Sequence, residues 1–178
     1  MISTTSIRSL IIITGACLLA IIAGGCATSN YGTTVGLEKP LNTYLAAYFS
    51  ADSEVAEDIG EQLFKFEEST SDKLSEAKLF QVVNIGQWEG KCEKSLDIKA
   101  TVTRIRKVTG TSRFFFGIFA GDAVVEATVT VSDGMTKQTH GTYTVKGTSG
   151  NNGFIGTTNT AINNAAKAIV KIIKENHT

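Results

Sequence analysis

Residues 123–134 decide the fold: Ala123-Val124-Val125-Glu126-Ala127-Thr128-Val129-Thr130-Val131-Ser132-Asp133-Gly134. Apolar side chains alternate here with polar ones, which is the period-two pattern of a strand with one buried face. The Asp-Gly pair at the end is a strong hairpin signal. Because the alternation resumes at Gly141, Tyr143 and Val145, the segment predicts two strands joined by a turn at residues 132–136.

Three segments on the N-terminal side of this hairpin also have strand patterns. Residues 96–103 alternate between apolar and polar side chains, and the phase slips at Arg104-Ile105, which indicates a β-bulge or the end of pairing. Residues 79–85 and 42–49 predict two shorter strands. Residues 86–94, with glycines and charges of both signs, predict a loop.

Two segments have helical periodicity. Apolar residues at near-3.6 spacing across residues 55–77 predict a long amphipathic helix, and those across residues 162–173 predict a second one. Lysines near the C-terminal end of the second helix complement its dipole. The candidate N-caps are Asp52 or Ser53 for the first helix and Thr157, Thr158 or Asn159 for the second.

The predicted element order is therefore β-α-β-β-β-β-α over a single domain, residues 42–178. This order favours the α/β (α+β) class, a two-layer sandwich with a mixed sheet and both helices on one face. The opposite face of the sheet would carry Thr, Lys, Glu and Gln side chains. Such a face either meets water or contacts a partner.

The N-terminal residues 1–25 have the layout of a secretory signal peptide that ends at Cys26. One basic residue, Arg8, precedes an apolar run over residues 10–23, and Gly24 and Gly25 follow it. A cysteine directly after small residues predicts a bacterial lipoprotein that is processed and acylated at Cys26. Two alternatives remain, an uncleaved anchor and an ordinary signal with an incidental cysteine. The apolar run is short for an anchor, because a spanning helix needs about 20 apolar residues.

Lipidation would give the chain a membrane partner. Two or three acyl chains on Cys26 would hold it stably at a bilayer. Residues 26–41 are rich in Gly and Thr without a sustained period. They predict a flexible tether between the lipid and the domain.

Composition and spacing argue against several kinds of chemistry. The chain has 17 basic and 17 acidic residues, so it lacks the basic excess of a nucleic-acid-binding protein. After processing Cys92 is the one cysteine left for the domain, which predicts an inert thiol, with a reactive thiol or an intermolecular disulfide as alternatives. His140 falls on the polar phase of its strand and is predicted to lie at the surface. His140, His177 and Cys92 are too far apart in sequence to predict a metal site, and no catalytic array or cofactor motif is present.

Residues 113–122 are the most unusual segment: Arg113-Phe114-Phe115-Phe116-Gly117-Ile118-Phe119-Ala120-Gly121-Asp122. The segment holds four of the nine phenylalanines, although loops are usually polar. Either these rings extend the flanking strands and cap the core, or they form an apolar contact with a partner or a membrane. The candidate contact residues are Arg113, Phe114, Phe115, Phe116 and Phe119.

On three of these features the chain resembles bacterial lipoproteins of domain-of-unknown-function family 4410. The features are the segment around Gly117-Ile118-Phe119-Ala120-Gly121, the strand that ends in Asp133-Gly134, and the Gly-Thr-Thr lead-in to the Ala-rich terminal helix. The resemblance covers roughly residues 42–174. It implies a Gram-negative envelope lipoprotein with a small α/β domain and no catalytic residues. Ala27, in the place where Asp would favour inner-membrane retention, implies the outer membrane, facing the periplasm.

The sequence thus predicts a non-catalytic, lipid-anchored periplasmic lipoprotein that acts as a binding or assembly module with an envelope protein partner. The alternative is an auxiliary lipoprotein subunit of an envelope transport system that handles lipid or another apolar ligand. A hydrolase is the third class, and the sequence supports it least.

Overall fold

The computed structural model describes residues 29–36, 40–90, 92–109, 111, 121–150 and 156–177. Cys26 and the candidate contact residues Arg113, Phe114, Phe115, Phe116 and Phe119 lie outside these ranges. The elements within them are β1 (Ser29–Val35), the 3-10 helix η1 (Leu41–Thr43), β2 (Ala46–Ser53), α2 (Gly60–Glu76), β3 (Val82–Ile85), β4 (Ser95–Arg106), β5 (Val124–Asp133), β6 (Thr139–Thr148) and α4 (Thr158–Glu175).

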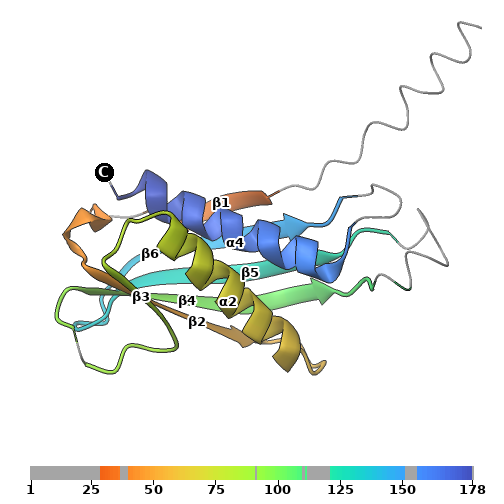
Figure 1. The fold of residues 1–178 in the computed structure, drawn as a ribbon, viewed down its shortest axis with the longest axis horizontal. Helices are drawn as coiled ribbons and strands as arrows, with labels where there is room; N and C mark the ends of the chain where they lie inside the picture. The colour runs from red at the N-terminus through yellow and green to blue at the C-terminus, as the bar shows by residue number, and fades with distance from the viewer. Residues whose placement is uncertain are drawn as a thin grey trace, which may run out of the picture.

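The described strands form one sheet in the order β1-β6-β5-β4-β2-β3. Strand β2 runs parallel to β3 and β4, and the pairs β4–β5, β5–β6 and β6–β1 are antiparallel. Both α-helices cover the same face of this mixed sheet (Figure 1). The predicted α+β two-layer sandwich is therefore confirmed. No helix in the described ranges is long and apolar enough to cross a bilayer.

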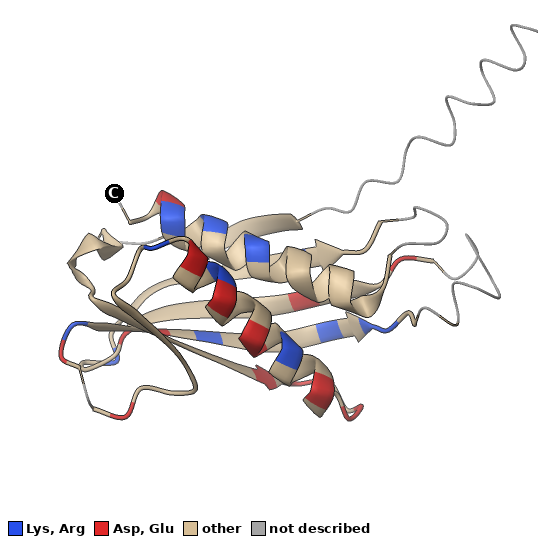
Figure 2. Cartoon of the chain, in the orientation of Figure 1, with Lys and Arg blue, Asp and Glu red and all other residues tan. Residues whose placement is uncertain are grey.

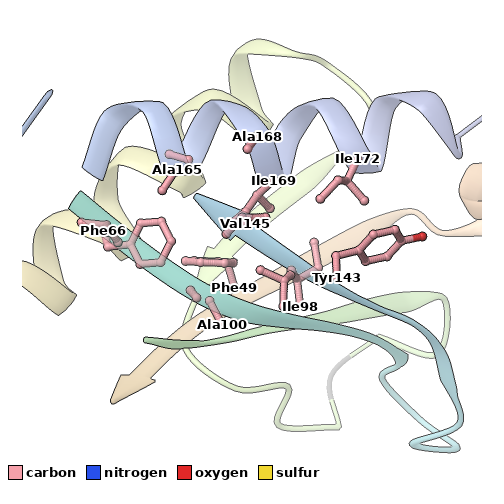
Figure 3. Packing of buried hydrophobic residues seen from close by; sticks show 14 of the residues in the cluster. Phe49, Phe66, Ile98, Ala100, Tyr143, Val145, Ala165, Ala168, Ile169 and Ile172 are labelled. Carbon is pink, nitrogen blue, oxygen red and sulfur yellow. The ribbon is translucent and has the colours of Figure 1, made fainter. Parts of the chain in front are cut away.

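The core fills the space between the helices and the sheet with interlocking apolar side chains (Figure 3). Phe49 on β2 and Phe66 on α2 pack edge to face, with ring centroids 5.8 Å apart. Ile98 on β4 and Ile169 on α4 are both fully buried. A buried Phe or Ile side chain contributes about 1.5–3 kcal/mol, so these contacts hold the two layers together.

Helix α4 approaches β6 unusually closely at Gly147. A β-carbon at that position would lie 2.0 Å from the carbonyl oxygen of Ala161 and 2.4 Å from the backbone nitrogen of Ala165. Only glycine fits such a distance to backbone atoms. The small residues on this side of α4 therefore set how near the helix comes to the sheet.

The helix begins after Thr157, one of the predicted N-caps, whose N–H donates to Thr160 Oγ1 at 3.4 Å.

Two boundaries differ from the sequence prediction. Helix α2 begins at Gly60, because β2 continues through Asp52 and Ser53 and pairs there with Thr101 and Val102 of β4. The prediction that Asp52 or Ser53 caps the first helix is thus wrong, because both residues pair with β4 in the sheet. Residues 29–35, predicted as part of a flexible tether, form β1 and pair with β6.

Two bulges shape the antiparallel part of the sheet. The β4–β5 register shifts between Val102 and Arg104, which confirms the bulge predicted from the phase slip. The β5–β6 register shifts between Val131 and Ser132, and this shift leaves His140 without a cross-strand partner. An extra residue in one strand reverses which face the next side chain takes. His140 is accordingly buried, with 5 % of its surface exposed, so the predicted surface position is wrong.

Candidate functional site

One end of the sheet is the end at which β1 begins, three residues after the predicted lipidation site in the sequence. Strand β1 begins there with Ser29, which pairs with Gly147 of β6. Strand β4 ends near it at Arg106, β5 starts at Val124, and α4 starts at Thr158. We call this end of the sheet the anchor end. The connection between β4 and β5, whose sequence contains the candidate contact residues, leaves and enters the sheet here.

The sheet face opposite the helices carries polar side chains, and we call it the open face. Asp52, Thr101, Thr128 and Thr144 are neighbours in register across β2, β4, β5 and β6. All three threonines keep part of their surface exposed. The composition expected for this face is confirmed.

Ion pairs bridge neighbouring strands of the open face. Lys99 Nζ lies 2.7 Å from Asp52 Oδ2, and Lys146 Nζ lies 2.8 Å from Glu126 Oε1. Burial acts to raise the pKa of Asp52, but the hydrogen bonds from Lys99 and Thr101 outweigh it, and the pKa lies below its usual value. The hydrogen bond to Asp52 in turn raises the pKa of Lys99. Because the charges are paired, the open face offers hydrogen-bonding groups rather than a strong field of one sign.

The outer edge of β3 is apolar and exposed. Leu45, Val82 and Ile85 keep 41 %, 50 % and 48 % of their surface exposed, and we call these three residues the apolar edge. The backbone N–H groups of Gln81 and Val82 both donate to the carbonyl oxygen of Leu45, which joins the start of β3 to the residue before β2. No strand of the described chain pairs with this outer edge. Natural sheets usually protect such an edge with charge, proline or a covering segment.

A polar cluster of one buried and two partly buried side chains lies at the end of the sheet away from Ser29. Tyr44 Oη donates to Asp133 Oδ2 at 2.9 Å and lies 2.5 Å from His140 Nε2. A hydroxyl has one proton, so the His140 nitrogen must be the donor in the second bond. Asp133 Oδ1 also accepts from the N–H groups of Met135 and Thr136. The cluster joins the segment before β2 to the β5–β6 hairpin.

Burial first, then the hydrogen bond to Asp133, raises the pKa of Tyr44 above its usual value. Burial acts to raise the pKa of Asp133 too, but the hydrogen bonds from Thr136, Tyr44 and Met135 hold it below its usual value. The tyrosine is therefore protonated and the aspartate ionised at neutral pH. These protonation states suit a fixed structural contact. The sequence did not predict the cluster, because the bulge that buries His140 is not visible in the strand pattern.

The other candidate residues are separate from this cluster. Cys92 is a free, half-exposed thiol in the β3–β4 loop, where its carbonyl oxygen accepts from Trp88 Nε1 at 2.9 Å. The ring of His177 packs edge to face on Phe80. In the described ranges, no group of three or more His, Cys, Asp or Glu side chains is arranged to hold a metal ion.

An open groove of about 410 Å³ runs along the outside of the helix layer between α2 and α4. Figure 2 shows charges of both signs along the exposed side of α2. The groove contains one aliphatic residue, Ile162, so it is poorly suited to a lipid or another apolar ligand. Its lining consists of Lys65, Glu68, Ser69, Asp72, Lys73, Glu76, Asn159, Ile162 and Asn163.

The described chain is thus a small two-layer α+β domain with an open polar face and an apolar edge. Among solved structures, a variant of the PelC dodecamer from Paraburkholderia phytofirmans has a similar fold, with a TM-score of 0.52 and 16 % identity over 83 % of this chain and 97 % of that chain. A second PelC dodecamer structure from the same organism gives a TM-score of 0.50 and 14 % identity over the same shares.

At this identity the likeness shows the fold alone. A protein from Xanthomonas campestris assigned to domain-of-unknown-function family 330 aligns with a TM-score of 0.43 and 12 % identity, over 82 % of this chain and 88 % of that chain. No protein-family model matches the sequence, and no curated protein matches it. The resemblance to family 4410 remains a prediction.

Proposed function

We propose that this chain is a non-catalytic, lipid-anchored assembly module of the bacterial envelope, held at the membrane through acyl chains on Cys26. The observation that carries the proposal is the start of the sheet at Ser29, three residues after Cys26. Three residues span at most about 11 Å when fully extended. An anchor this short holds the anchor end of the domain at the bilayer surface.

A domain held in this way has its surfaces oriented for contacts with neighbours. The open face and the apolar edge then stand roughly perpendicular to the bilayer, where other envelope proteins can reach them. PelC, which has a similar fold, is a dodecamer in its crystals. This supports assembly as the role of the present chain.

The phenylalanine-rich segment fits the same proposal. The strands that flank it, β4 and β5, meet it at the anchor end. Contacts made by Phe114, Phe115, Phe116 and Phe119 would therefore form close to the bilayer. Ala27, which follows Cys26, favours the outer membrane and a periplasmic orientation.

The test replaces Cys26 with Ala in cells that are fed a labelled fatty acid. We expect the Cys26→Ala protein to remain an unprocessed precursor without the label. The matched control is Cys92→Ala, which removes the other mature cysteine and should leave labelling, processing and membrane fractionation unchanged. Normal labelling and processing of the Cys26→Ala protein would contradict the proposal.

A further inference from the structure

We propose that the open face binds an uncharged glycan at a patch of side chains around Tyr48. Asn84, Tyr48 and Asp97 are neighbours in register on β3, β2 and β4, so their side chains share one face of the sheet. Phe49, the next residue on β2, packs into the core on the other face, which places the patch on the open face. The inference goes beyond the proposed function and does not depend on the lipid anchor.

Two aromatic rings border the carboxylate of Asp97. Tyr48 is half-buried, so part of its ring meets water on the open face. Trp88 is half-buried as well, and Lys137 Nζ lies over its ring, 5.1 Å from the centroid. The same ammonium group lies 3.0 Å from Asp97 Oδ2, which places Trp88 beside the patch. The C–H side of a sugar ring is apolar and packs well on such rings, which combine an apolar body with a polar tip.

The polar groups of the patch present donors and acceptors side by side. Lys99 Nζ lies 2.7 Å from Asp52 Oδ2. Lys137 forms a second pair of this kind with Asp97. A hydroxyl both donates and accepts, so two adjacent hydroxyls of a sugar match a carboxylate next to an ammonium group. On the other side of the tyrosine ring, Asn84 adds an amide that both donates and accepts.

Two oxygen atoms of the patch have no hydrogen-bond partner among the described residues. They are Ser50 Oγ and Asp97 Oδ1, and both atoms are buried. Ser50 is only 8 % exposed, and its neighbour in register on β4 is Lys99. Buried polar atoms almost always have partners in native proteins. The side chains of Lys99 and Lys137 are long and about half exposed, so a bound sugar can displace them and supply the missing hydrogen bonds.

The charge balance of the patch selects a neutral ligand. Asp52 and Asp97 are each paired with an ammonium group, so a metal cation and an anion would both meet a like charge at short range. An extended peptide typically adds to a sheet edge through its backbone. The backbone of β2 is already paired with β3 and β4, so a ligand at the patch must be recognised by side chains. An uncharged glycan, with many hydroxyls, suits such recognition.

Trp88 is the one tryptophan of the chain, so its fluorescence reports binding at the patch. The full-length protein, in a detergent without a sugar headgroup, is titrated with maltotetraose and with chitotetraose. These two uncharged tetrasaccharides distinguish plain hexoses from N-acetylated ones. The comparison ligands are the anionic tetragalacturonate and the peptide tetra-alanine. We expect a saturable change in Trp88 emission with at least one uncharged tetrasaccharide, and none with the comparison ligands at the same concentrations.

Two variants each remove one feature of the patch. Tyr48→Leu removes the ring and Asn84→Ala removes the amide, and each should weaken binding about tenfold because a direct contact with the sugar is lost. The matched control is Thr144→Ala, at an exposed residue of β6 on the same face, which should bind like the wild type. Urea denaturation of each variant establishes that it is folded, and Asn84→Ala decides the test if Tyr48→Leu does not fold.

Three outcomes would overturn the proposal. They are no saturable change with either uncharged tetrasaccharide, tighter binding of tetragalacturonate or tetra-alanine, and folded patch variants that bind as well as Thr144→Ala. The Cys26→Ala protein should bind the tetrasaccharide as tightly as the wild type, because the patch does not involve the lipid. Failure of glycan binding therefore contradicts the patch alone, and failure of acylation contradicts the proposed function alone.

Discussion

At the scale of single residues, the contact among Tyr44, Asp133 and His140 explains how the chain secures the hairpin end of the sheet. The three side chains come from separate parts of the sequence and satisfy one another's hydrogen bonds. Buried polar groups are costly when left without partners. The cluster therefore fixes the segment before β2 against the hairpin, with Tyr44 as the residue that bonds to both of the others.

Replacement of Tyr44 by Phe should test this dependence. The change removes the donor to Asp133 and the acceptor for His140 Nε2, and leaves both groups partly buried without that partner. We expect the free energy of unfolding to fall by about 1–3 kcal/mol, measured by urea denaturation. Tyr48→Phe, at a half-buried tyrosine outside the cluster, is the control. Equal stability of the Tyr44 variant and the wild type would show that the cluster contributes nothing.

The pH dependence of stability should identify Asp133. Its folded-state pKa lies below the ordinary value of 3.8, so its ionised form stabilises the fold above that pH. The stabilisation is lost as the pH falls through the folded pKa. We therefore expect the stability difference between the wild type and Asp133→Asn to be largest near neutral pH and to shrink in acid. A difference that grows in acid would reverse the assigned sign.

At the scale of elements, the sequence predicted best where local pattern and pairing agree. The alternation in β5, the Asp133-Gly134 turn and the Thr157 cap were all readable from the chain. The start of α2 was not, because Asp52 resembles a helix cap but lies in register with Thr101. Strand β1 was missed although Tyr31 alternates with polar neighbours, because its glycine and threonines also suit a linker.

The close approach of α4 to β6 gives a prediction at this scale. Gly147→Ala should lower the free energy of unfolding by about 1–3 kcal/mol or more, because the added methyl group would overlap backbone atoms of α4. Gly32→Ala is the matched control, since a β-carbon at that strand position meets no atom within 4 Å. Thermal unfolding of both variants measures the difference. A tolerated Gly147→Ala change would mean that α4 can move away from the sheet at little cost.

At the scale of the whole molecule, the strand order determines which surfaces are available for contacts with a partner. The lipidation site at Cys26 stays a prediction, which residues 18–26 support by themselves because a signal peptide is a local pattern. The apolar edge was not predictable, since Val82 and Ile85 look like core residues until the sheet order places β3 at the end. The open face was predictable in composition, but its ion pairs depend on the register between strands.

The position of the domain relative to the bilayer tests the central claim most directly. In a Cys92→Ser background, a fluorophore is attached either at Asn159, an exposed residue at the start of α4, or at Met135 in the β5–β6 turn. Energy transfer to an acceptor in the lipid headgroups then reports the height of each site above the membrane. We expect strong transfer from Asn159 and weak transfer from Met135, because a ten-residue strand of about 33 Å separates the two ends of the sheet. Equal transfer from the two sites, or stronger transfer from Met135, would contradict the account that the anchor end faces the membrane.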